Sequence, residues 1–174
     1  MVVDSADMKK DAGLLLLMLA VGWAVPGFSA TNGLVNFGRV NDSLYRGAQP
    51  DVLAMKQLKD LGVKSIINLR MTNDLWNAES ALATTFSMAY TNIPLDNLAA
   101  PTDAQVANVL AAIENMPKPV FMHCQFGRDR TGTLIACYRI RHDHWLNSKA
   151  LNEAKAYGFS PFELGMRQYI MRFE

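Results

Sequence analysis

A cysteine and an arginine stand close together in the segment from His123 to Gly132, which reads HCQFGRDRTG. An apolar stretch precedes the segment and an apolar helical pattern follows it, which predicts a strand, a short loop and a helix. Backbone N–H groups of such a loop can point at one centre, and the helix N-terminus adds the positive end of its dipole. The segment therefore predicts an anion site.

Three residues of this segment are of types that suit nucleophilic attack on a bound phosphate. Cysteines at helix N-termini beside cationic groups have their pKa lowered from about 8.5 to roughly 3.5–7.5, which makes Cys124 a candidate nucleophile. Arg130 offers a planar fork that matches two phosphate oxygens. Gly127 permits a backbone angle that a curled loop needs. Together they favour a thiolate that attacks a phosphorus atom.

Strands and helices are expected to alternate along the rest of the chain, after a loop at 31–43. This alternation predicts an α/β fold with a central, mostly parallel sheet flanked by helices. Ligands of such sheets bind beyond the carboxyl ends of the strands, and Cys124 follows a strand end. The predicted strands are 44–46 (a short edge strand), 63–69, 89–95 and 119–123, and the predicted helices are 51–61, 74–86, 101–115, 131–143, 147–157 and 161–174.

Two of these helices are expected to begin with a capping box, in which the N-cap side chain and one three residues later each bind a backbone N–H. The pairs are Thr102 with Gln105 and Ser160 with Glu163. Pro161 suits the first position of the last helix.

The pattern His-Cys-x5-Arg-Thr-Gly resembles the signature loop of the cysteine-dependent protein tyrosine phosphatase superfamily. Residues 36–50, which contain LYRGAQP, resemble the opening segment of the small atypical dual-specificity phosphatases. Residues 66–70 (IINLR) resemble their next strand, and 145–158 the tail of their bacterial members. The resemblance covers most of residues 36–173 and implies a protein tyrosine phosphatase-like fold of the dual-specificity type.

The resemblance also implies a two-step reaction that needs no metal and no other cofactor. Cys124 attacks the phosphoryl group to give a phosphocysteine, which water then hydrolyses. Thr131 would bond the sulfur and ease its departure, and His123 would orient the loop and favour the thiolate rather than act as a base. The phosphate would be held by the loop N–H groups and by Arg130, over Gln125, Phe126, Gly127, Arg128, Asp129 and Arg130.

A general acid must protonate the leaving oxygen. The family usually takes an aspartate from a loop after the preceding strand, and Asp96 fits that place. Asp129 is the rival, because the Gly-x-Asp-Arg-Thr form of the loop resembles myotubularin-type and some bacterial phosphatases. Asp103 is a weaker candidate, because its place beside Thr102 is explained by helix N-terminal charge.

The expected substrates are phosphotyrosine, phosphoserine and phosphothreonine in proteins. The alternative is a phosphoinositide or inositol phosphate, whose additional phosphates Arg128 could contact; Arg128 is equally well explained as a surface residue. A catalytically silent phosphate-binding module is a further alternative, which the intact Cys124 and Arg130 argue against.

Composition narrows the class of protein. Half of the 174 residues are hydrophobic and the net charge is +1, which excludes a disordered chain and argues against a nucleic-acid binder.

Cys137 lies about 10 Å beyond Arg130 on the same predicted helix, too far to bridge Cys124, and is expected in the core. His142 and His144 point to different sides of a helix, so no metal site is predicted. A monomer is expected.

Residues 1–30 resemble a targeting segment. Lys9 and Lys10 precede the uncharged run 14–25, and small residues follow it, which is typical of a secretory signal; Met8 is a possible true start. The run rises only about 18 Å as a helix, short of the roughly 30 Å core of a bilayer. We expect an exported, periplasmic or secreted protein with a phosphatase domain over 31–174, or one anchored to the membrane by 1–30.

Overall fold

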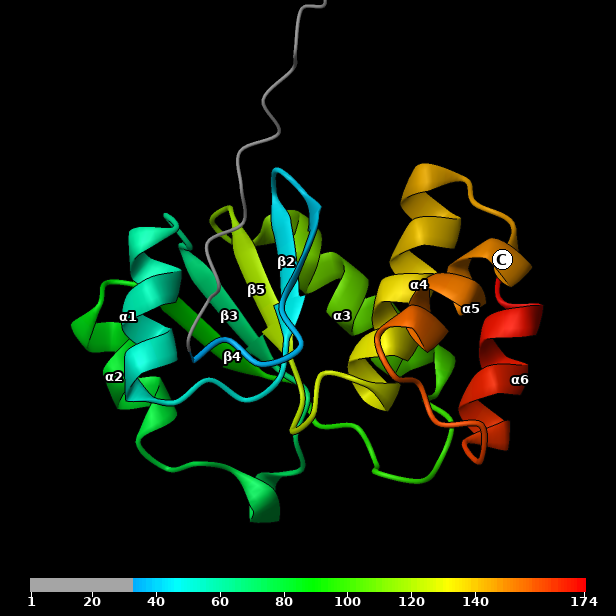
Figure 1. Cartoon of the computed structure of the whole chain (residues 1–174), viewed down its shortest axis with the longest axis horizontal. Helices are drawn as coiled ribbons and strands as arrows, with labels where there is room; N and C mark the ends of the chain where they lie inside the picture. Colours follow the sequence, from blue (N-terminus) through cyan, green and yellow to red (C-terminus); the bar gives the residue numbers. More distant parts are fainter. Residues whose placement is uncertain (1–32) are drawn as a thin grey trace, which may run out of the picture.

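The computed structural model describes residues 33–174, whose central element is a sheet with the strand order β1-β2-β5-β3-β4 (Figure 1). β1 is antiparallel to β2, and the other neighbouring pairs are parallel, which confirms the predicted mostly parallel sheet. The strands are β1 (Gly38–Asn41), β2 (Leu44–Gly47), β3 (Ser65–Asn68), β4 (Ala89–Asn92) and β5 (Val120–His123).

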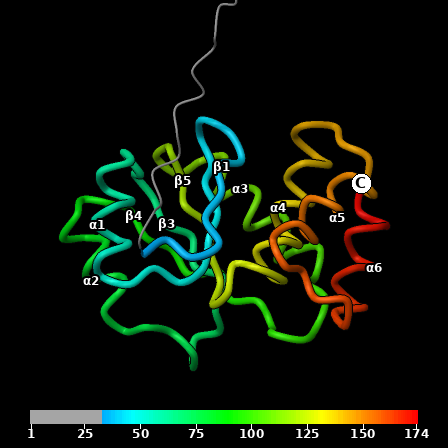
Figure 2. Tube along the Cα trace, in the orientation of Figure 1, coloured from blue at the N-terminus to red at the C-terminus, as the bar shows by residue number. Residues whose placement is uncertain are grey.

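Helices cover both faces of the sheet (Figure 1; Figure 2). One face carries α1 (Val52–Asp60) and α2 (Glu79–Thr85), preceded by the short 3₁₀ helix η1 (Thr72–Asp74). The other carries α3 (Asp103–Asn115) and α4 (Asp129–Asp143), with α5 (Asn147–Ala156) and α6 (Leu164–Arg172) packed outside α4. This arrangement is the predicted α/β fold.

The core consists of one apolar layer on each face of the sheet, because successive strand residues point to opposite sides. Ile66 of β3 packs with Leu58 of α1, whereas its neighbour Ile67 packs with Leu134 of α4. All four side chains are fully buried. The two layers clamp the sheet and fix the ends of its parallel strands at one edge.

The N-terminal hairpin differs from the prediction. β1 lies within 31–43, where we expected a loop, so β2 is not an edge strand but sits between β1 and β5. The two strands are joined by a tight turn in which Ser43 N donates to Oδ1 of Asn41 at 2.9 Å. The turn residues Asn41, Asp42 and Ser43 also favour a loop, so their types alone do not predict the hairpin.

One of the two predicted capping boxes and one predicted helix differ from the structure. The Thr102–Gln105 capping box is present, whereas the Ser160–Glu163 box is wrong. There Ser160 Oγ accepts from the N–H of Phe162 at 3.2 Å, which forms a turn, and the last helix begins only at Leu164. A single helix over 74–86 is also wrong, since η1 and α2 are separate elements.

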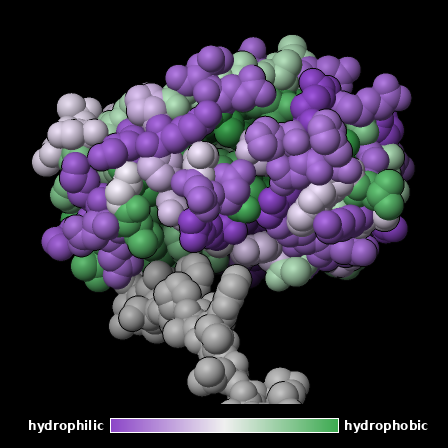
Figure 3. Space-filling view, turned by 90° about the horizontal axis from the view of Figure 1, so that it is seen from above, coloured by the Kyte–Doolittle hydropathy of each residue, from purple (hydrophilic) through white to green (hydrophobic). Residues whose placement is uncertain are grey.

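The segment predicted as a signal peptide or membrane anchor, 1–30, lies outside the described residues. Within residues 33–174, no helix combines the length and apolarity that crossing a membrane requires. The face seen in Figure 3 is largely hydrophilic, with small hydrophobic patches between polar side chains.

Candidate active site

The predicted anion loop lies at the carboxyl end of the central strand. β5 ends at His123, Cys124 follows directly, and α4 begins at Asp129. We call residues 124–130 the Cys–Arg loop. Cys124 and Arg130 are 3 % and 6 % exposed, and both line one pocket of about 280 Å³, here called the Cys124 pocket. Its lining also includes Asn97, Gln125, Phe126, Asp129 and Glu163.

The loop is held from behind through its carbonyl groups. Gln125 O accepts from Gln49 N at 3.1 Å, and Phe126 O accepts from Asn36 Nδ2 at 3.1 Å. Gly127 O accepts from Asn36 Nδ2 at 3.0 Å and from Arg46 Nη2 at 2.7 Å. In a trans peptide the following N–H points opposite to the carbonyl. The N–H groups that follow these three carbonyls therefore point away from the scaffold, as an anion cradle requires.

Gly127 is where the loop comes closest to the scaffold. Its φ is +67°, in the left-handed region that favours glycine. A Cβ atom there would lie 2.5 Å from the backbone carbonyl of Gly47. The predicted need for glycine is thus explained both by the backbone angle and by lack of space.

Arg46 places a buried positive charge behind the loop. It is 1 % exposed, and its guanidinium carbon lies 3.9 Å from the centre of the Tyr157 ring. Burial lowers the pKa of Arg46 to about 10, and the charges of Tyr157, Glu153 and Cys124 oppose that shift. Arg46 is therefore still a cation at neutral pH, close enough to Cys124 to interact with it.

Two further groups at the start of α4 offer donors. Arg130 Nη1 and Thr131 Oγ1 are buried and have no hydrogen-bond partner within residues 33–174. Buried donors without partners are costly, so each calls for an explanation, and a bound anion or a catalytic role is one. Arg130 lines the Cys124 pocket, which places this donor capacity beside the thiol.

His123 lies beneath the loop and not in the Cys124 pocket. Its side chain is fully buried, and Nδ1 lies 3.1 Å from the carbonyl oxygen of Cys124. Nε2 lies 2.8 Å from Oε1 of Glu79, which is also fully buried. The predicted orienting role of His123 thus has a partner that sequence reasoning missed.

The two candidate general acids occupy different places. Asp96 is exposed in the loop between β4 and α3, and its Oδ1 accepts from the N–H groups of Leu98 and Ala99 at 2.8 and 2.9 Å. These bonds lower the pKa of Asp96, and the Arg130 charge adds to the effect. Its neighbour Asn97, not Asp96, lines the Cys124 pocket.

Asp129 lines the pocket itself and is held by the chain before α6. Its Oδ1 accepts from the N–H of Ser160 at 2.7 Å. Glu163 lines the same pocket, and burial together with the charge of Asp129 raises the pKa of Glu163. The sequence pattern around Glu163 predicts helix capping, and nothing in it links this residue to Cys124.

Arg128 faces away from the Cys124 pocket. Its exposed side chain lies along Gly158 and lines a neighbouring pocket of about 570 Å³. That pocket shares Gln125 and Phe126 with the Cys124 pocket. The second loop arginine is therefore not beside Cys124 but next to an adjoining hollow.

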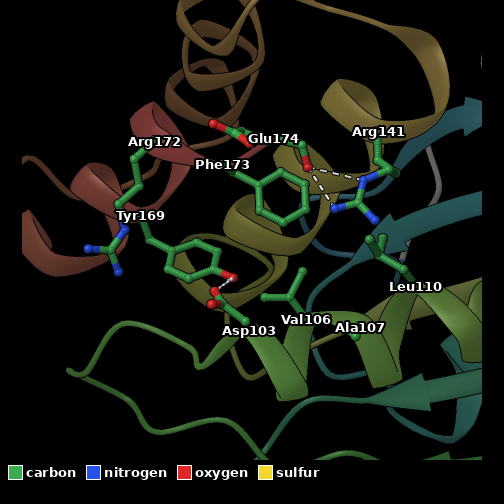
Figure 4. Close-up of a pocket in the computed structure, with 9 residues that line it drawn as sticks. All are labelled: Asp103, Val106, Ala107, Leu110, Arg141, Tyr169, Arg172, Phe173 and Glu174. Atoms are coloured by element: carbon green, nitrogen blue, oxygen red, sulfur yellow. Dashed lines mark hydrogen bonds between the residues drawn. The ribbon is translucent and has the colours of Figure 1, made fainter.

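A third hollow, of about 510 Å³, lies between α3, α4 and α6 (Figure 4). Tyr169 donates there to Oδ1 of Asp103 at 2.7 Å, so Asp103 supports helix packing rather than the Cys124 pocket. Apart from Asp103, the weaker candidate for the general acid, no predicted catalytic residue lines this hollow. Across the part of the chain that is described, no group of three or more His, Cys, Asp or Glu side chains could hold a metal ion.

Comparison with known proteins identifies the class. The family described as "DSP-PTPase phosphatase fused to NAD+ Kinase" matches residues 25–171, and the chain belongs to this family. The match covers most of the chain, including the Cys–Arg loop and its scaffold.

Individual relatives agree with this class. The dual specificity protein phosphatase TpbA of Pseudomonas aeruginosa is 30 % identical over 139 residues, which cover 75 % of this chain and 58 % of TpbA. The chain thus spans little more than half the length of that relative. The inositol diphosphatase DSP4 of Arabidopsis thaliana is 23 % identical over 146 residues, 80 % of this chain and 72 % of DSP4.

A solved structure shows the same fold. The crystal structure of Pseudomonas aeruginosa TpbA in complex with phosphotyrosine superposes with a TM-score of 0.70 at 26 % identity, over 80 % of this chain and 85 % of the other. The protein tyrosine phosphatase-like fold is therefore confirmed.

Proposed function

We propose that this chain hydrolyses phosphomonoesters of phosphorylated proteins through a phosphocysteine intermediate. One observation carries the proposal: Cys124 and Arg130 line the same 280 Å³ pocket at the carboxyl end of the central strand. The dual-specificity phosphatase TpbA, as a relative, supports the substrate class.

The reaction proceeds in two balanced steps. In the first, Cys124 Sγ forms a bond to phosphorus, the ester P–O bond breaks, and the leaving oxygen takes a proton. In the second, water attacks phosphorus, the S–P bond breaks, and the proton from water passes to the group that donated the first one. Arg130 and the loop N–H groups stabilise the charge on the transferring oxygens in both steps, while Thr131 donates to the departing sulfur.

Asp96 is our proposed proton donor, with Asp129 as the alternative. A donor must be protonated before the first step, and the pKa of Asp96 is lowered. If Asp96 is the acid, its protonated fraction falls as pH rises above that lowered pKa. Activity should then be greatest in acid and decline toward neutral pH.

Leaving groups of different acidity distinguish the two candidates. Asp96→Asn should slow hydrolysis of phenyl phosphate by about 10²-fold but affect 4-nitrophenyl phosphate little, since a good leaving group needs no proton. Asp60→Asn, on the exposed face of α1, is the control for removal of a carboxylate. A leaving-group effect in Asp129→Asn that is absent in Asp96→Asn would assign the donor to Asp129.

The proposed activity is tested on the full chain. Phosphate release from phosphotyrosine, phosphoserine and phosphothreonine peptides in EDTA should be measurable and inhibited by vanadate. Binding of a phosphopeptide without turnover would contradict the proposal and support the silent binding module instead.

An inositol phosphate is the second candidate substrate, favoured by Arg128 and by the Arabidopsis relative. Arg128 lies on a pocket that adjoins the Cys124 pocket, where a second phosphate on the same ring could lie. Arg128→Gln should then raise KM for an inositol polyphosphate about tenfold, the loss expected for one charged contact. An equal change for a phosphotyrosine peptide would argue against this role.

We propose in addition that residues 1–30 direct export, and that the protein is a monomer. The basic start, uncharged run and small-residue exit support the targeting proposal. N-terminal sequencing of the native protein tests it: a mature end near residue 30 supports a cleaved signal, and an intact N-terminus contradicts one.

A further inference from the structure

A buried polar cluster joins three strands and a helix behind the Cys–Arg loop. Glu79, the first residue of α2, accepts through Oε2 from Asn68 Nδ2 at 2.6 Å. Tyr90 of β4 donates to the same oxygen at 3.4 Å. Burial and the Glu79 charge raise the pKa of Tyr90 to about 12, so this hydroxyl keeps its proton. Oε1 of Glu79 lies 2.8 Å from Nε2 of His123.

The burial of Glu79 costs free energy that apolar packing alone does not offset. A carboxyl group that is fully buried loses its hydration, which is strongly unfavourable unless the group is paired and hydrogen-bonded. Glu79 has its partners in Asn68, Tyr90 and His123, from three different strands. These contacts hold the start of α2 against β5, the strand that directly precedes Cys124.

A count of hydrogens shows what Glu79 does to His123. Nδ1 of His123 faces the carbonyl oxygen of Cys124, which can only accept, so Nδ1 carries a hydrogen. Nε2 lies 2.8 Å from Oε1 of Glu79, within hydrogen-bond distance of a group that accepts. The ring therefore presents a donor to the Cys124 peptide, and its orientation is also fixed by stacking on Phe121, at 5.6 Å between ring centres.

We propose that Glu79 is a positioning residue for Cys124, acting through His123. The Cys124 carbonyl accepts at Nδ1, and the Glu79 carboxylate at Nε2 favours a hydrogen on that nitrogen as well, which draws positive character to the ring beneath the Cys124 carbonyl. That hydrogen bond orients the peptide leaving Cys124, and the positive ring favours the thiolate. The inference rests on the proposed function, because it assigns a role for a reactive Cys124.

Other charges also act on Cys124, so the effect of Glu79 is measured against them. Around the thiol, the charged or titratable groups are Arg46 on β2, Glu79 on α2, His123 on β5, Asp129 and Arg130 on α4, and Glu163 before α6. Asp74 on η1 and Asp96 before α3 also interact with the charge of Arg130. Glu79→Gln alters one of them and leaves the side-chain shape nearly unchanged.

The test is the pH dependence of Cys124 alkylation by iodoacetamide in the full chain, with the alkylated cysteine identified by mass spectrometry. In Glu79→Gln the pH at which alkylation of Cys124 is half-maximal should rise by about one pH unit, the size of shift that a nearby charge typically causes. For an aryl phosphate, kcat should fall about tenfold while KM stays within about threefold. Glu114→Gln, on the exposed side of α3, is the matched control and should change neither.

An unchanged midpoint in a folded Glu79→Gln protein overturns the proposal. If that variant does not fold, Tyr90→Phe removes one donor to Oε2 and should give a smaller upward shift; no shift there would overturn it as well. Alkylation needs no substrate. A chain with no phosphatase activity but with the predicted midpoint shift would therefore refute the proposed function and leave the role of Glu79 standing.

Discussion

The pocket side of the Cys–Arg loop is made by consecutive residues, whereas its back is held by residues from distant parts of the chain. Cys124, Asp129 and Arg130 reach the pocket from one short stretch. Asn36 and Arg46 hold the loop carbonyls from the N-terminal hairpin region. The difference teaches that the nucleophile and the phosphate-binding groups are local in sequence, while the shape that aims them depends on the tertiary fold.

Arg130→Lys should have the largest effect and should act on the pocket side alone. Lysine keeps the charge but not the planar fork, so kcat should fall about 10³-fold with the fold intact. Steady-state kinetics and circular dichroism measure the two quantities. Arg167→Lys, on the exposed side of α6, should leave both unchanged. A loss below tenfold would mean that charge, not geometry, is what Arg130 contributes.

Gly127→Ala tests the back of the loop. The new methyl group would meet the backbone of Gly47 at 2.5 Å and would require a strained φ. Stability should fall by about 3 kcal/mol, and kcat by about 10²-fold as the loop shifts. Gly62→Ala has a similar positive φ but no neighbour within 4 Å, and should cost only about 1 kcal/mol. Equal losses of stability in urea melts would show that the close approach is unimportant.

Arg46→Met separates the charge behind the loop from its packing. Methionine fills much of the same volume and removes the cost of burying a charge, and Gly127 O still accepts from Asn36, so stability should change by about 1 kcal/mol or less. The loss of the bond to Gly127 O and of the positive charge should lower kcat about tenfold. Arg39→Met, at the exposed position of β1, is the control. Unchanged kcat would show that the back does not influence the reaction.

Thr131→Ala should affect only one of the two reaction steps. Loss of one hydroxyl donor to the sulfur should slow breakdown of the phosphocysteine about tenfold, the equivalent of one hydrogen bond. Rapid mixing with an aryl phosphate should then show a burst of phenol before a slower steady rate. Thr133→Ala, whose hydroxyl donates instead to Asp129 O at 2.8 Å, should show no such burst. A burst of equal size in both variants would contradict the role of Thr131.

The pocket side of the Cys–Arg loop could be predicted because its residues form one continuous sequence pattern. Residues 123–132 combine a strand end, a loop and a helix start, and that pattern alone placed Cys124 and Arg130 together. The sheet was predictable for the same reason, since β3 and β5 are short apolar runs. Thr102 and Gln105 marked the start of α3 through local hydrogen bonds.

The residues that hold the back of the Cys–Arg loop could not be predicted, because no local sequence pattern marks them. Asn36 lies far from Phe126 in sequence, and its φ of 52° and side-chain bonds arise only in the folded chain. Glu79 resembles an ordinary acidic residue in the first turn of a helix, although it is fully buried. Glu163 was assigned to a capping box that a Ser160 turn replaces.

The most direct test of the account is to trap the covalent intermediate. The full chain is mixed with an aryl phosphate in EDTA, quenched within milliseconds and digested, and both cysteine peptides are weighed by mass spectrometry. Cys137 is the internal control, because it is buried in α4 and burial raises its pKa to about 12. The account predicts a phosphoryl group on Cys124 and none on Cys137. Turnover that continues in Cys124→Ser, with no phosphocysteine in the wild-type chain, would contradict it.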